Sequence, residues 1–409
     1  MRGRLARLLL SVVVMTGACH DAAAPVAPLT AGAAAAPRGD PIVIGGTLDL
    51  SGPLAAESAD IMAAYALWAD DVNAGGGLLG RPVEVVVYDD GARPASARSL
   101  YRRLIVQDDA DLLLAPNAPL VAHVLPLAEA SAMLLFNGGP ASAALRSEWL
   151  VDVATYTEAD QARGVFELID ALPARRRPWR VGVVTVDDPV LRRVRDGVDG
   201  RGGVLQLARE RDLDVVFDEE HPDDAGVTAA AAVRARRARV DLFFALVPAA
   251  DAAALARGAR EADFTPAIFC ACGEPVAGTP AWEDLGAAGE GIVFPAMAWT
   301  SDRHPGIAAL SAQVRARSVH GGLPVRMTSA YAILQVIEEA VLRAGAIDQP
   351  ALRAQVAGQV IDTAVGRVAF DGRHIPAFQG IVVQSRRGGD QVVWPPQRAT
   401  AAAQMPVGG

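Results

Sequence analysis

The chain has 409 residues, enough for two domains of ordinary size, each with its own hydrophobic core. It carries 38 Lys and Arg against 47 Asp and Glu, a net charge of -9, which predicts a mildly acidic surface. Nucleic-acid binding needs a basic surface, and no basic stripe interleaved with aromatic residues stands out in the sequence, so a nucleic-acid partner is disfavoured.

The first residues have the pattern of a secretory signal peptide. Three arginines precede the apolar run Leu8–Ala18, which is too short to span a bilayer as a mature helix. Small residues directly before Cys19 are typical of the bacterial lipobox, in which the cysteine is acylated. We therefore expect a lipoprotein signal peptide over residues 1–19, with lipidation at Cys19. Ordinary signal cleavage nearby, which would leave a soluble periplasmic protein, is the alternative.

Residues 20–40 are rich in Ala, Pro and Gly, which predicts a flexible tether. Together these features predict a periplasmic protein, or one on the extracytoplasmic surface, that a lipid anchor holds to a membrane.

Short apolar runs rich in branched residues alternate with helical patterns along the first part of the folded body. Runs that are apolar on both faces and separated by helices predict a parallel sheet covered on both sides. The predicted strands are Ile42–Leu48, Val83–Asp89, Asp111–Ala115 and Met133–Phe136, and the predicted helices are Glu57–Val72, Ala95–Val106 and Val121–Ala132.

The same alternation recurs further along and predicts a second α/β lobe, with strands at Arg180–Val186, Val204–Glu210, Val240–Val247 and Ala267–Cys272. A third section has a strand-like run at Gly291–Trp299, helices at Met327–Ala344 and from Gln349, and late strands. Because this section makes no complete lobe, the chain is expected to return and complete the two already built. Several crossings would make a hinge, and the crevice between the lobes is the expected ligand site.

The triple glycine Gly75–Gly77 raises the question of a phosphate-binding turn. A dinucleotide fingerprint has its glycines after a strand and before a helix, whereas these follow a helix and precede a strand. They therefore predict the end of a helix and a tight return. The chain also contains no lysine, which excludes a P-loop, and no cofactor is expected.

Motifs of enzymes and metal sites are missing from the sequence. It has neither G-x-S-x-G nor H-E-x-x-H, and its six histidines lack metal-ligand spacing, so neither an enzyme nor a metal site is expected. Asp89 and Asp90 could serve acid–base chemistry, but a solvated strand end that caps a turn is favoured. Cys270 and Cys272 are too close for an unstrained disulfide, and buried free thiols are favoured over a redox or metal role.

Several stretches, in order along residues 41–396, resemble the leucine/isoleucine/valine-binding (branched-chain amino-acid-binding) family of type I periplasmic binding proteins, which feed ABC importers. The resemblance lies in VNAGGGLLGRPVEVVVYDDGARPASA, in the Leu-Ser-Gly-Pro loop at Leu50–Pro53, in TSAYAILQVIEEAVLRAGAIDQPALRAQV, and in GRVAFDGRH and VVWPP. It implies an α/β fold of two Rossmann-like lobes with parallel sheets, joined by a three-crossover hinge. The implied N-terminal lobe is 41–155 and 297–363, the C-terminal lobe is 156–296 and 364–398, and 399–409 is a disordered tail.

The resemblance also implies a function. A monomeric solute-binding protein would capture a small molecule in the inter-lobe cleft and deliver it to the transmembrane permease of an ABC importer. A sensory or regulatory protein that signals to a membrane receptor from the same fold is the alternative. Two further alternatives are a hydrolase using Ser51 or Ser142 beside His123, which is disfavoured, and a degenerate pocket that binds little.

Candidate ligand-binding residues follow from the resemblance position by position. They are Ser51, Asn117, Ala118, His123, Asn137, Gly138, Gly139, Ala141 and Ser142 in the first lobe, Tyr156 near the first crossover, and Phe244 and Glu274 in the second lobe. For His123 a surface or helix-packing role stays open, and for Tyr156 a hinge-packing role.

Glu274 stands where the family has the acidic residue that meets the ligand's amine, whereas Ala118 and Ala141 replace hydroxyl residues that hold its carboxylate. An unpaired buried carboxylate is unfavourable, so the ligand is expected to be less polar than a standard amino acid. Backbone N–H groups of Gly138 and Gly139 could still bind an anion.

Overall fold

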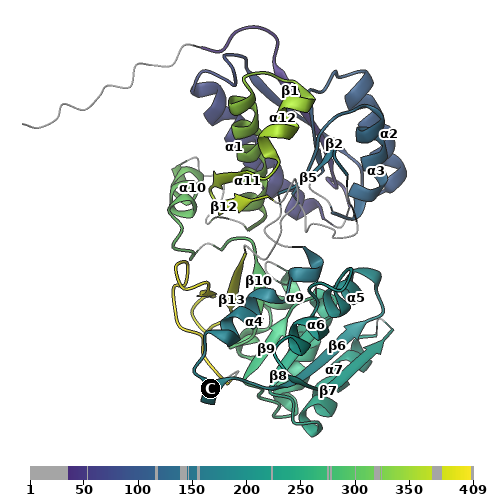
Figure 1. Ribbon diagram of the computed structural model, residues 1–409, viewed down its shortest axis with the longest axis vertical. Coiled ribbons are helices and arrows are strands. Elements are labelled where there is room, and N and C mark those ends of the chain that lie inside the picture. Colours follow the sequence, from purple (N-terminus) through teal and green to yellow (C-terminus); the bar gives the residue numbers. More distant parts are fainter. Residues whose placement is uncertain are drawn as a thin grey trace, which may run out of the picture. The chain divides into compact units, whose positions relative to one another are not determined.

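The computed structural model is an α/β fold with two lobes, each built on its own sheet (Figure 1). It describes residues 36–406 except positions 53, 116–117, 139–144, 146, 154–156, 223, 274–275, 277–278, 300, 317–322, 324 and 371–379. The predicted class, two α/β lobes with parallel sheets, is confirmed.

The first sheet has five parallel strands in the order β2-β1-β3-β4-β5. They are β1 (Ile42–Leu48), β2 (Val83–Asp89), β3 (Leu112–Ala115), β4 (Leu135–Asn137) and β5 (Leu150–Asp152). One face packs against α1 (Ala55–Ala74), α10 (Pro305–Ala316), α11 (Val325–Ala344) and α12 (Gln349–Val356), and the other against α2 (Pro94–Val106) and α3 (Ala118–Ala130). A hairpin of β11 (Val360–Thr363) and β12 (Gly366–Ala369) joins the first of these cores.

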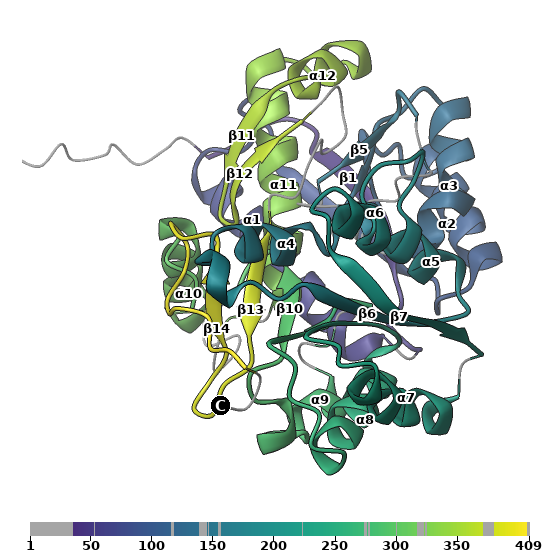
Figure 2. The same cartoon turned by 60° about the horizontal axis from the view of Figure 1, so that its bottom comes forward.

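The second sheet has seven strands in the order β14-β13-β10-β9-β8-β6-β7. Five are parallel: β6 (Arg180–Val186), β7 (Asp214–His221), β8 (Leu242–Leu246), β9 (Ile268–Ala271) and β10 (Val293–Ala296). At one side β13 (Ile381–Gln384) and β14 (Gln391–Trp394) run antiparallel. The helices α4 (Arg163–Asp170) and α6 (Val204–Arg209) pack in one core of this sheet, and α7 (Ala225–Arg237) and α8 (Ala249–Glu261) in the other (Figure 2). Two short helices, α5 (Pro189–Asp196) and α9 (Pro280–Glu283), complete the lobe.

The triple glycine ends α1, as the sequence predicts. Gly76 and Gly77 have φ of 103° and 78°, a region that favours glycine. A Cβ at Gly77 would lie 2.1 Å from the carbonyl oxygen of Arg81, so the chain needs a glycine there to turn back into β2. This stretch is scaffold.

One predicted strand is wrong. Val204–Glu210 forms the helix α6, because Val204, Leu207 and Ala208 bury one helical face, whereas the strand itself is β7, which follows it. The prediction of a disordered tail is also wrong for residues 399–406. The N–H of Gln404 donates to Oε1 of Gln384 at 2.9 Å, and the N–H of Thr400 donates to the carbonyl of Val392 at 2.8 Å, which fixes this segment to the sheet.

The lobe boundaries remain a prediction. Within them, Val368 of β12 packs in the core of the first sheet although it lies beyond position 363, because β12 pairs with β11.

Candidate functional site

The carboxyl edge of the first sheet carries a serine bound to an aspartate. Ser51 follows β1, and its hydroxyl hydrogen-bonds to the carboxylate of Asp89 at the end of β2. The N–H groups of Leu50 and Gly91 donate to Asp89 Oδ1 at 2.9 and 3.0 Å. These hydrogen bonds, the one from Ser51 above all, lower the pKa of Asp89. The predicted ligand-binding hydroxyl of Ser51 is therefore engaged with a protein carboxylate.

Asp49 fixes the loop that contains Ser51. It is buried, and its Oδ1 and Oδ2 accept hydrogen bonds from the N–H groups of Gly52 and Leu54 at 2.6 and 2.8 Å. A Cβ at Gly52 would lie 2.4 Å from Asp49 Oδ1, so the close approach depends on glycine. This aspartate holds the loop between β1 and α1 rather than presenting its charge to solvent.

Asp90, which follows β2, is buried, contrary to the expectation of a solvated strand end. Its side chain is completely buried, Oδ1 accepts from the N–H of Ala92 at 2.8 Å, and Oδ2 has no hydrogen-bond partner within the described part of the chain. Burial raises the pKa of Asp90, and the hydroxyl of Thr47 offsets part of this rise. The hydrogen bond from Ala92 agrees with the predicted role of Asp90 in capping a turn. The prediction that Asp90 is solvated was wrong.

Asn137 and Asp152 end the neighbouring strands β4 and β5 at the same edge. Both are buried, and Asn137 Nδ2 donates to Asp152 Oδ1 at 2.8 Å. Gly138 follows directly, and a Cβ there would lie 1.7 Å from Cδ1 of Ile333 in α11. The structure thus brings the predicted residues Asn137 and Gly138 to the carboxyl edge, together with Asp152, for which no role was predicted.

Two other predicted residues lie elsewhere. His123 is exposed in the second turn of α3. Phe244 is in the middle of β8, completely buried, and stacks on Phe166 with ring centroids 5.2 Å apart. The prediction that Phe244 contacts a ligand is therefore corrected, because its ring belongs to the core of the second lobe.

Of the remaining candidates, one lies at the start of a helix. Ala118 begins α3, directly after β3. The following candidates lie outside the described residues: Asn117, Gly139, Ala141, Ser142, Tyr156, Glu274 and the predicted lipidation site Cys19.

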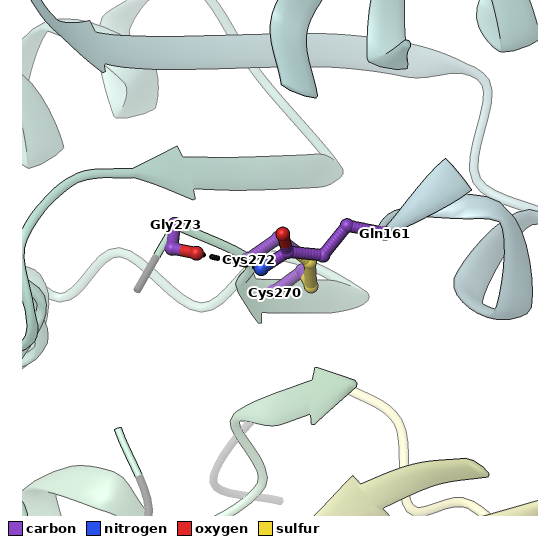
Figure 3. Close-up of a disulfide and its surroundings, with 4 residues drawn as sticks. All are labelled: Gln161, Cys270, Cys272 and Gly273. Carbon is purple, nitrogen blue, oxygen red and sulfur yellow. Dashed lines mark hydrogen bonds between the residues drawn. A yellow bond between two sulfur atoms is a disulfide. The ribbon is translucent and has the colours of Figure 1, made fainter. Parts of the chain in front are cut away.

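A disulfide lies directly before the segment that contains the candidate residue Glu274. Figure 3 shows Cys270 and Cys272 joined by a disulfide beside Gly273. The expectation of free thiols was wrong, because the Cα atoms of the two cysteines lie 5.4 Å apart, within the normal range for disulfides. Both cysteines are buried, as expected.

A long-range hydrogen bond holds the same segment. Nε2 of Gln161 donates to the carbonyl oxygen of Gly273 at 2.6 Å (Figure 3), and Gln161 is buried. A Cβ at Gly273 would lie 2.3 Å from the backbone nitrogen of Val247, so Gly273 is packed closely against the end of β8. Gln161 was missed because a partner 112 residues away leaves no local signal in the sequence.

A family model described as "Periplasmic binding protein" matches residues 41–390. The chain belongs to the periplasmic binding protein family. The resemblance found in the sequence is confirmed, and the chain is a solute-binding protein of transport systems rather than an enzyme. The family also implies a location outside the cytoplasm. No curated protein sequence matches this periplasmic binding protein.

Solved structures share the fold of this periplasmic binding protein. The branched-chain amino acid transporter substrate-binding protein LivJ from Streptococcus pneumoniae, in complex with isoleucine, is 18% identical, with a TM-score of 0.69 over 87% of this chain and 100% of that one. The fatty acid ABC transporter substrate-binding protein from Thermomonospora curvata is 21% identical, with a TM-score of 0.66 over 93% and 99%. A solute-binding protein from R. palustris, in complex with 4-hydroxybenzoate, is 17% identical, with a TM-score of 0.69 over 90% and 96%.

No described helix combines the length and the apolar character needed to cross a membrane. Among the same residues, no group of three or more His, Cys, Asp or Glu is arranged to hold a metal ion.

Proposed function

We propose that this periplasmic binding protein captures a small, weakly polar molecule between its two lobes and delivers it to the permease of an ABC importer. The family match over residues 41–390 is the observation that carries this proposal. The relatives named above include proteins in complex with isoleucine and 4-hydroxybenzoate and a fatty acid transporter protein, so one scaffold serves ligands of very different polarity.

The charges at the carboxyl edge of the first sheet support a ligand without a free carboxylate at that end. Asp49, Asp89, Asp90 and Asp152 all lie at the ends of its strands or directly after them. The hydroxyl of Ser51 and the amide of Asn137, two candidate ligand-binding groups, are instead bonded to Asp89 and Asp152. An anionic ligand group close to Asp89, whose pKa is lowered, would meet a like charge, and like charges at close range repel.

The test uses acid and amide pairs on the unlipidated chain starting at residue 20. Isoleucine with isoleucinamide, 4-hydroxybenzoate with 4-hydroxybenzamide, and octanoate with octanamide are compared by thermal shift and then by calorimetry. A ligand specific for the folded form stabilises it by about 2.7 kcal/mol at a hundredfold excess over Kd, which such a screen detects easily. We expect the amide to bind more tightly than the acid in at least one pair.

Three outcomes would contradict different parts of the proposal, one of which is that Glu274 meets the amine of a ligand. If an acid binds more tightly than its amide, solute binding stands and the inference about polarity is wrong. If the Glu274→Ala variant keeps full affinity for an amine-bearing ligand, Glu274 has no role in binding it. Flat responses across a broad library would instead favour a pocket that binds little.

The anchoring of the protein forms a separate part of the proposal. We infer that the mature protein is tethered through a lipid on Cys19, on the basis of the lipobox-like residues before it, and that it is a monomer, as the family resemblance implies. The Cys19→Ser variant should leave the membrane fraction, whereas the parent protein should require detergent for extraction. If both variants fractionate alike, the lipid anchor is absent.

A further inference from the structure

Two arginine clusters that are distant in sequence meet at the amino edge of the second sheet. Arg175, Arg176 and Arg177 precede β6, whereas Arg236, Arg237 and Arg239 lie at the end of α7 and before β8. Since β6 and β8 are parallel neighbours, their amino ends lie at the same edge of the sheet. We call these six arginines the basic edge.

Arg180 connects the two clusters. It begins β6, and its Nε and Nη2 donate to the carbonyl oxygens of Arg239 and Ala238 at 3.1 and 3.0 Å. The N–H groups of Trp179 and Arg180 both donate to the carboxylate of Asp241, directly before β8. The backbone segments that carry the two clusters are therefore fixed to each other.

The charge of the basic edge is not neutralised by neighbours. All six arginines are exposed, and none forms an ion pair with a described residue. Asp170, Asp214 and Asp241 at this edge are already engaged, with Arg211 at 2.8 Å, with Arg180 at 3.4 Å and with the backbone, and Asp212 before β7 and Asp263 before β9 offset only part of the charge of six arginines. This concentration of positive charge stands out on a chain with a net charge of -9.

An exposed tryptophan lies within the basic edge. The side chain of Trp179 is 55% exposed, and the guanidinium of Arg180 lies 5.2 Å from the centroid of its ring. Tryptophan is favoured at the boundary between water and lipid, where its ring contacts apolar material and its N–H stays hydrated. Arginines around such a ring add attraction to anionic headgroups.

We propose that the basic edge and Trp179 form a docking surface for an anionic phospholipid membrane. Exposed, unpaired arginines provide the charge complementarity, and Trp179 provides the apolar contact that a purely electrostatic partner would not need. The interaction would be weak and reversible, since the net charge of the whole protein opposes it at long range. It is independent of the ligand of the binding protein and of the lipid on Cys19.

The test is vesicle flotation of the unlipidated chain starting at residue 20, with phosphatidylcholine vesicles with and without phosphatidylglycerol. We expect binding only to the anionic vesicles, and loss of binding as salt increases. Each arginine removed should weaken binding roughly fivefold at low salt. Arg236→Gln with Arg237→Gln should therefore weaken it roughly 25-fold.

A matched control removes the same charge elsewhere. Arg98 and Arg102 are exposed on α2 in the first lobe and form no ion pair with a described residue. Arg98→Gln with Arg102→Gln should leave vesicle binding within about twofold of the parent, because these two charges lie outside the basic edge. The Trp179→Ala variant should weaken binding and remove the blue shift of tryptophan fluorescence on adding anionic vesicles. Thermal melts confirm that each variant is folded.

Three results would overturn the proposal. These are absence of binding to anionic vesicles at low salt, equal binding to both kinds of vesicle, or an equal loss in the control variant. Binding of a DNA duplex without binding of vesicles would identify a nucleic acid as the partner and would also reject the membrane proposal.

Discussion

Arg398 holds Asp302 in a bidentate ion pair in which the aspartate side chain is fully buried. Nε of Arg398 lies 2.9 and 3.2 Å from the two carboxylate oxygens, and Nη2 also contacts Oδ2. Asp302 lies between β10 of the second sheet and α10, which packs on the first, whereas Arg398 follows β14 of the second sheet. The ion pair thus fixes the C-terminal segment to a connection between the lobes.

Removal of Arg398 alone should be strongly destabilising. Arg398→Ala leaves Asp302 buried without its partner, which should lower the free energy of unfolding by about 3–5 kcal/mol in urea denaturation. The control is Arg343→Ala, which breaks a more exposed i,i+4 pair with Glu339 and should cost about 0.5 kcal/mol. A loss at Arg398 as small as in the control would show that the buried pair contributes little.

Gln161 should affect ligand affinity as well as stability. The Gln161→Ala variant leaves the carbonyl of Gly273 without its donor, which should lower the free energy of unfolding by about 1–3 kcal/mol. Because Gly273 directly precedes the candidate ligand-binding residue Glu274, the same variant should weaken ligand binding. Gln384 is the matched control: it is also buried, and it donates to the carbonyls of Gly291 and Gln404 at 2.9 and 2.8 Å. Gln384→Ala should lower stability by a similar amount and leave calorimetric affinity unchanged. Equal affinity losses in both variants would indicate a general effect of instability.

A methyl group at Gly138 should collide with Ile333. The Gly138→Ala variant should lose about 1–3 kcal/mol in denaturant titrations, because α11 must shift or the Ile333 side chain must leave its rotamer. Ile333→Val removes the atom that collides and should recover part of this loss in the double variant. If the two substitutions are additive, the contact between these residues does not cause the destabilisation.

Asp90 makes the stability of the first lobe depend on pH. Its folded-state pKa is raised by burial above the unfolded value of about 3.9, so the folded state favours the neutral acid. This stabilisation is fully present below the unfolded pKa and is lost as pH rises through the folded pKa. Relative to the parent, Asp90→Asn should therefore gain stability between pH 4 and pH 7, as measured by urea denaturation at each pH. If Asp90→Asn instead loses stability relative to the parent as pH rises over this range, the pKa of Asp90 is not raised in the folded state.

The sequence predicts elements well where local pattern alone determines them. β1 and β6 are apolar runs in the interior of their sheets, and β2 is an edge strand with three consecutive valines; the predicted bounds of all three match the structure. β7 was missed because only Val215, Val216 and Phe217 form an apolar run in it, and the rest of this edge strand is charged or polar, with Glu219 paired to Arg234 of α7. The short apolar helix α6 was mistaken for a strand because six residues give too little periodicity to separate the two.

The candidate site was predictable in position but not in its contacts. The sequence indicates which residues end the strands, and Asn137 and Gly138 do lie at the carboxyl edge. It does not indicate that Asn137 bonds to Asp152 or that Phe244 stacks on Phe166, because tertiary packing decides both contacts. The two arginine clusters of the basic edge come together through the pairing of β6 with β8, which leaves no local pattern in the sequence.

The burial of Cys270 and Cys272 has a consequence for how the protein matures. Neither sulfur-bearing residue exposes any surface once the second lobe has formed, so an oxidant cannot reach the thiols of the native state. Oxidation must then accompany or precede the final packing, after the chain has been exported to an oxidising compartment. Material produced in the cytosol should fold around two thiols and stay reduced in air, whereas secreted material should resist alkylation until it is unfolded and reduced.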